Sequence, residues 1–145
     1  MELVYPKEAQ LRILTVLKTE LMDAGEMALF SNDITPDVNT VVADLTEATF
    51  TGYARATLTT WLAARLNTAL EGVQTSPLAA FAAAAPFTVG EDVYGGWIED
   101  SNGDLILMFR FDNAPIPMAA VGNAIVVAVD HILGNPAGQG MCSNE

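Results

Sequence analysis

The chain has 145 residues, a length that suits a single domain with a substantial core. Its 18 acidic and 6 basic residues give a net charge of −12, which argues against binding to nucleic acid or to an anionic membrane. Hydrophobic residues make up 51% of the chain but aromatic residues only 8%, and much of the apolar content is alanine. Alanine buries little area, so we expect neighbouring subunits to cover part of the apolar surface.

Residues 7–24 are the strongest helix candidate. Leu14, Leu17 and Leu21 recur at helical spacing, and most charged residues of this segment lie on the opposite side. A proline precedes the segment and a glycine follows it, as is typical of helix boundaries. We expect an amphipathic helix that covers one end or face of a sheet, with docking on a partner as the alternative.

A short strand is predicted next, with Met27 and Leu29 on one side and Ala28 and Phe30 on the other. After it, Thr40 could cap a short helix, and residues 46–53 have the pattern of an extended segment.

The segment 55–72 carries leucines at helical spacing, but its threonine-rich first half also suits a strand. The residues alone leave both alternatives open.

The last third of the chain is predicted to be extended. Residues 77–87 suit a buried strand, because Pro86 rules out a helix running through it. Prolines at 115 and 117 suit a sheet edge, since they donate no hydrogen bond to a ladder. Residues 124–133 alternate as a final strand, and the polar tail 134–145 is predicted to be flexible.

Residues 92–112 predict a β-hairpin around Asn102-Gly103, the pair favoured in a two-residue type I′ turn. That turn would pair Asp100 with Leu105, Ile98 with Leu107 and Gly96 with Phe109. The ring of Phe109 could then cover the bare backbone of Gly96.

The predicted register gives the hairpin two different faces. The core face would carry Tyr94, Ile98, Leu105, Leu107, Phe109 and Phe111. The other face would be partly wet, with Trp97 opposite Met108 and Glu99 opposite Ile106.

The candidates for chemistry are few. His131 is the only histidine and Cys142 the only cysteine, so a catalytic triad or a zinc site lacks partners. Residues 100–104 resemble the start of a calcium loop, but Leu105 and Phe111 occupy the positions that need glycine and glutamate. We therefore expect no catalytic residue, no metal and no cofactor.

Arg110 is the most informative charged residue of the hairpin. It could stack on Trp97, its diagonal neighbour, or pair with an acid across an interface. The candidate interface residues are Trp97, Arg110, Leu14, Leu17 and Leu21.

Two parts of the chain resemble a group of small tailed-phage virion proteins. The motifs that carry the resemblance are NDITP at 32–36, ADLTEATF at 43–50 running into GYA at 52–54, and YG at 94–95 followed by an aromatic, a short acidic turn and the apolar run 105–111. An apolar helix at the start and a final strand after Gly122-Asn123 also suit this group. The resemblance favours a strand over residues 54–63.

The resemblance implies a mainly β fold, a β-sandwich or jelly-roll-like domain over residues 26–133 with the N-terminal amphipathic helix, and no enzyme activity. It implies a capsid decoration or cement protein on the outside of a phage head, bound to the major capsid protein and to copies of itself as a homotrimer. The alternative is a tail or baseplate tip protein that binds a host glycan, with Trp61 or Trp97 as an exposed stacking platform. A small hydrolase is the third and weakest hypothesis, because no nucleophile elbow is present.

Overall fold

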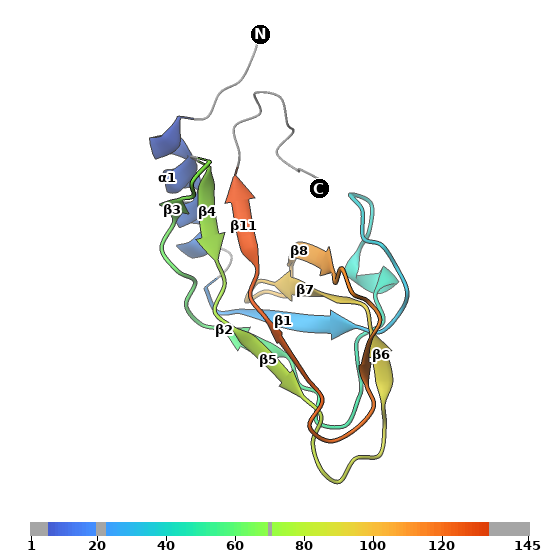
Figure 1. Ribbon diagram of the computed structural model, residues 1–145. Coiled ribbons are helices and arrows are strands. Elements are labelled where there is room, and N and C mark those ends of the chain that lie inside the picture. The colour runs from blue at the N-terminus through green and yellow to red at the C-terminus, as the bar shows by residue number, and fades with distance from the viewer. Residues whose placement is uncertain (1–5, 20–22, 70, 134–145) are drawn as a thin grey trace.

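The computed structural model describes residues 6–19, 23–69 and 71–133, in which strands dominate and one helix lies at the N-terminal end (Figure 1). The elements are α1 (Lys7–Leu17), β1 (Gly25–Phe30), η2 (Val42–Asp44), β2 (Ala56–Leu58), β3 (Arg65–Leu66), β4 (Gly72–Thr75), β5 (Ala79–Ala82), β6 (Glu91–Val93), β7 (Gly95–Glu99), β8 (Leu105–Arg110), β9 (Ile116–Met118), β10 (Ala124–Val127) and β11 (Asp130–Leu133). The predicted fold class, mainly β with an N-terminal helix, is confirmed. A jelly-roll topology stays a prediction.

The central sheet is antiparallel and has the strand order β2-β1-β7-β8. Strand β1 is apolar on both sides because both faces of this sheet are covered. Met27 and Leu29 belong to one hydrophobic cluster and Ala28 and Phe30 to another, and each is at most 1% exposed. The predicted division of this strand into two apolar sides is confirmed.

Two short antiparallel ribbons, β5–β10 and β6–β9, pack their inner sides against the central sheet. The larger hydrophobic core lies between these ribbons and the central sheet. Its buried members include Met27, Leu58, Phe81, Val93, Ile98, Met118 and Ile125. Because these side chains come from seven strands, this core holds the sheets together in a sandwich-like arrangement.

Helix α1 covers a third sheet, in the order β11-β4-β3, as Figure 1 shows. The side chain of Gln10 accepts a hydrogen bond from the backbone N–H of Gly72 at 2.8 Å, and Leu14 is fully buried. A Cβ atom at Gly72 would lie 2.9 Å from Leu14 Cδ1, so glycine allows the close approach of helix and strand. The α-helix runs to Leu17, and residues 18 and 19 continue it as a π-helical turn. Of the rest of the predicted helix, residues 20–22 lie outside the described residues, and residues 23 and 24 form a turn.

The segment for which the sequence allowed either a helix or a strand is extended or irregular in the structure. Within 55–72 the described residues form β2, β3 and the first residue of β4, and no helix. Of the strand favoured for residues 54–63, only 56–58 are a strand, and residues 59–63 are irregular. The predicted final strand 124–133 is divided into β10 and β11. Ser76 causes the division, because its N–H donates to Val129 O and its Oγ accepts from Val129 N–H, each at 2.9 Å.

The hairpin β7–β8 is present, but its predicted type I′ turn is wrong. The loop has three residues: Gly103 N–H donates to Asp100 O at 3.1 Å, and Asp100 N–H donates to Asp104 O at 2.9 Å. Gly103 has a positive φ of 84°, whereas Asn102 does not. The Asp100 carboxylate explains this choice, since it accepts the backbone N–H groups of Asn102 and Asp104 and so stabilises the longer loop.

The three-residue loop shifts the strand pairing by one residue from the predicted register, and a β-bulge in β8 restores that register. Glu99 pairs with Leu105 and Ile98 with Leu107, so Ile106 is the extra residue on β8. Beyond the bulge the predicted register is confirmed, including Gly96 opposite Phe109. The Phe109 ring covers Gly96 as expected, with its Cζ atom 2.7 Å from the point that a Cβ atom of Gly96 would occupy.

The predicted faces of the hairpin are wrong at three positions. Because of the bulge, Leu105 packs on the Trp97 side and Ile106 against the larger core. Tyr94 also packs on the Trp97 side, since the chain bends there: its N–H donates to Phe30 O while its carbonyl accepts from Phe111 N–H. The Trp97 face is dry rather than partly wet, with Trp97 1% exposed.

We predict that Gly96→Ala destabilises the fold by about 1 to 3 kcal/mol, through overpacking. The added methyl would lie 2.6 Å from Ala28 O and 2.7 Å from Phe109 Cζ. Urea unfolding followed by circular dichroism measures the change. The matched control is Gly103→Asn, where the space is open and asparagine accepts a positive φ. An equal or larger loss in the control would contradict the prediction.

Candidate functional site

Arg55 is the centre of the best-defined group of charges. Its Nε and Nη2 atoms donate to the two carboxylate oxygens of Glu47, each at 2.8 Å, in a bidentate pair. Its Nη1 atom donates to Glu99 Oε2 at 2.7 Å and lies 3.7 Å from Glu26 Oε2. One guanidinium therefore holds three carboxylates.

Trp97 forms the floor beneath Arg55. The guanidinium carbon lies 5.6 Å from the centre of the Trp97 ring, and the indole N–H donates to Glu99 Oε1 at 2.7 Å. Both oxygens of Glu99 thus have a partner, which allows its side chain to be only 10% exposed.

Tyr53 links this group to the central sheet. Its hydroxyl donates to Glu47 Oε1 at 2.9 Å and accepts the backbone N–H of Leu29 at 3.1 Å. Hydrogen bonds from Arg55 are the main cause that holds the pKa of Glu47 below its usual value. The same bonds raise the pKa of Arg55, and burial raises the pKa of Tyr53, so Glu47, Tyr53 and Arg55 keep their charge states at neutral pH.

The register of the central sheet brings these residues together. Glu26 is paired with Glu99 across β1 and β7, and Met27 with Ala56 across β1 and β2. Arg55, one residue before Ala56, therefore extends over β1 toward both glutamates. An arginine at this position neutralises two acids that face each other directly, a pairing that is otherwise unfavourable.

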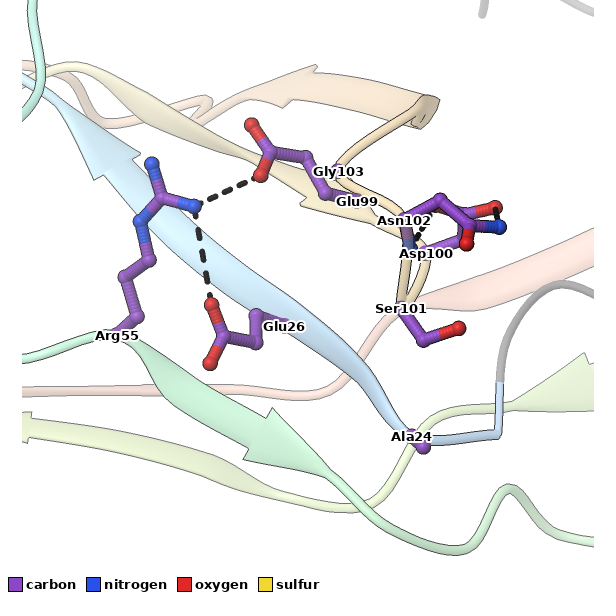
Figure 2. A pocket seen from close by; sticks show the side chains of 8 residues that line it. All are labelled: Ala24, Glu26, Arg55, Glu99, Asp100, Ser101, Asn102 and Gly103. Atoms are coloured by element: carbon purple, nitrogen blue, oxygen red, sulfur yellow. Dashed lines mark hydrogen bonds and ion pairs between the residues drawn. The ribbon is translucent and has the colours of Figure 1, made fainter.

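A cleft of about 390 Å³ opens beside Arg55, as Figure 2 shows. Its lining consists of Ala24, Glu26, Arg55, Glu99, Asp100, Ser101, Asn102 and Gly103. Asp100 keeps its charge readily, because the N–H groups of Asp104 and Asn102 donate to its carboxylate and lower its pKa. The cleft thus presents three carboxylates around a guanidinium that is already paired.

Two further features bear on the chemistry of the described residues. Among residues 6–19, 23–69 and 71–133, no three histidine, cysteine, aspartate or glutamate side chains gather as metal ligands. No helix in this part of the chain has the length and apolar character needed to cross a membrane.

The predicted interface residues lie in different environments. Trp97 is buried under Arg55, and Leu14 is buried between α1 and β4. Leu17 is half-buried, and Leu21 lies outside the described residues. Leu14 therefore packs against the chain's own sheet, and Trp97 is covered within the same chain.

The expected stacking of Arg110 on Trp97 is corrected, and a contact across an interface stays a prediction. Its guanidinium lies over Tyr94, 5.2 Å from the ring centre, because Arg55 occupies the face of Trp97. It pairs within the chain, donating to Asp33 Oδ1 at 2.7 Å and to Ile34 O at 2.8 Å. Arg110 thus fastens the loop after β1 to strand β8.

The Arg55 cluster was not found from the sequence. Glu47, Tyr53 and Arg55 are separated by even numbers of residues, so an extended segment could place them on one side. The partner Glu99 comes from a strand 44 residues away, and the sequence holds no local signal for that pairing.

His131 lies opposite Gln74 in the pairing of β11 with β4. These side chains are on the face of β4 that carries Gly72, which is the face under α1. The Nδ1 atom of His131 and the Oε1 atom of Gln74 are buried without a hydrogen-bond partner. Burial lowers the pKa of His131, because removal from water disfavours the charged imidazolium form.

Comparison with known proteins gave no match: no family model, no curated protein and no solved structure is similar to this chain.

We predict that Arg55→Met lowers the free energy of unfolding by about 2 kcal/mol at neutral pH, because Glu47 and Glu99 lose their cationic partner and keep only the neutral donors Tyr53 and Trp97. The loss should shrink as the pH falls below 4.5, the usual pKa of glutamate, through the lower folded-state pKa of Glu47. Urea unfolding over a pH series measures both effects. Arg12→Met on the exposed side of α1 is the control, and an equal loss there would contradict the prediction.

We predict that acid weakens the wild-type fold through His131. The unfolded chain takes up a proton near pH 6.5, whereas the folded chain does so only at lower pH, so stability should decline as the pH falls below 6.5. In His131→Leu this part of the pH dependence should be absent. Thermal unfolding between pH 7 and pH 5 tests it, and parallel curves for both proteins would refute the prediction.

Proposed function

We propose that this protein is a non-enzymatic structural protein of a tailed-phage virion, a capsid decoration or cement protein on the outside of the head. It would bridge capsomers by binding the major capsid protein and copies of itself. The motifs that resemble small virion proteins suggest the setting, and the outer face of the β5–β10 ribbon is the observation that carries the mode of action.

The β5–β10 ribbon is apolar on both of its faces. Its inner face carries Phe81 and Ile125 into the core. Its outer face pairs Ala80 with Val126 and Ala82 with Ala124, and all four residues are exposed. An antiparallel ribbon with one face in water normally carries polar residues there, so an apolar outer face favours a surface that is covered in an assembly.

The apolar character continues beyond the paired residues. Beside the paired Val126, which is 61% exposed, Leu78 before β5 is 74% exposed and Val121 before β10 is 55% exposed. This uncharged surface belongs to a chain with a net charge of −12, so like-charge repulsion between neighbours is least where this face is used. This combination suits a protein that attaches through its apolar face while the rest of its acidic surface stays hydrated.

The number of copies in each oligomer stays a prediction. The homotrimer expected from the resemblance can be tested by sedimentation of the purified protein. The alternative, a tail or baseplate protein that binds a glycan, is less supported, because its expected stacking platforms Trp61 and Trp97 are each 1% exposed.

We predict that Val126→Glu lowers occupancy of phage heads by about tenfold, because it places a carboxylate in a contact without a partner. The measurement is the copy number on purified heads and tails after the variant is supplied in excess. Val38→Glu is the matched control, since Val38 is 98% exposed in a loop away from the ribbon. Wild-type copies on tails alone, or equal occupancy by the variant, would contradict the proposal.

A further inference from the structure

Strand β8 forms an open edge of the central sheet. In the order β2-β1-β7-β8 its hydrogen-bonded neighbour is β7, and its other side is free within the described part of the chain (Figure 1). Phe111 N–H donates to Tyr94 O, toward β7. Because backbone groups alternate in an antiparallel ladder, Met108 and Arg110 direct their N–H and C=O groups away from β7.

The side chains along this edge are mostly apolar. The sequence of β8 is LILMFR, and each of its residues is half-buried. Ile106, Leu107 and Phe109 pack against the larger core, while Leu105 and Met108 pack on the Trp97 side. An added strand would therefore find backbone partners and apolar contacts on both faces of the sheet.

Several other sheet edges in the described part of the chain are interrupted or shorter. Pro117 interrupts the ladder groups of β9, and strands β2 and β3 have three and two residues. Strand β8 has six residues and neither proline nor lysine, two of the usual protections of an edge, while a bulge at Ile106 and the charge of Arg110 mark its two ends. Among the edges that the structure describes, β8 is the longest.

The charges at the two ends of β8 decide which partner fits. Asp104 before the strand and Asp112 after it are exposed, and neither is in a described ion pair. If two copies paired antiparallel through Met108, Asp104 of one would lie opposite Asp112 of the other. Like charges directly opposite are unfavourable, so a second copy is a poor occupant.

We propose that β8 binds an extended segment of a different protein by strand addition, and that this segment has apolar residues in its middle and lysine or arginine at both ends. The apolar part pairs with the β8 edge, and the basic ends meet Asp104 and Asp112. This goes beyond the proposed function, because it concerns a different surface from the β5–β10 ribbon and needs no phage particle for its test.

The test uses a fluorescent peptide of alternating valine and threonine with two lysines at each end. Anisotropy should show binding to the wild-type chain, and a peptide with glutamates in place of the lysines should not bind. Amide exchange at Met108 and Arg110 should slow when the lysine peptide is present. Equal binding of both peptides, or unchanged exchange, would overturn the proposal.

Asp104→Lys and Asp112→Lys should each lower the affinity for the lysine peptide by roughly two- to fivefold, which is the effect of losing one exposed charge pair. Asp92→Lys is the matched control, since it makes the same change of charge at the exposed middle residue of β6. Both strand-end positions are exposed, so circular dichroism should show an unchanged fold. Equal loss in all three variants, or sedimentation that shows pairing of two copies through β8, would refute the proposal.

Discussion

Scarce positive charge is the constraint on which the structure depends. The chain has six basic residues for 18 acidic ones, and three of the six fasten segments that are distant or change direction. Arg55 joins β2 to Glu47 and Glu99, Arg110 joins β8 to Asp33, and Lys18 pairs with Asp23 at 2.6 Å between α1 and β1. The side chains of each pair are partly buried. Such ion pairs add little to the net free energy of folding, so their main effect is to fix the relative positions of the segments they join.

The arginines also explain how acids can lie so close to the sheet. Glu99 is nearly buried because Arg55 and Trp97 satisfy both of its oxygens. Lysine offers no planar fork for the bidentate contact with Glu47 and stacks less well on an indole ring, so it would not replace Arg55. The central sheet therefore carries its charge in two organised groups, around Arg55 and Arg110, while the β5–β10 ribbon has an outer face without charge.

The parts of the fold that depend on local pattern could be predicted from the sequence. Strand β1, the hairpin register beyond its bulge and the packing of Phe109 on Gly96 follow from alternation and turn residues. The Arg55 cluster could not be predicted, because Glu99 and Arg55 meet only through the order of strands in the sheet. The burial of Trp97 depends on the same order, and the division of β10 from β11 depends on the distant Ser76.

The loop of the β7–β8 hairpin and the bulge at Ile106 are two irregularities of opposite effect. The loop displaces the pairing by one residue, and the bulge restores it before Ile98 meets Leu107. If a single residue were lost from either place, Leu107 and Phe109 would exchange faces with Met108. During evolution this hairpin can therefore change length only by paired insertions or deletions, one in the loop and one in the strand.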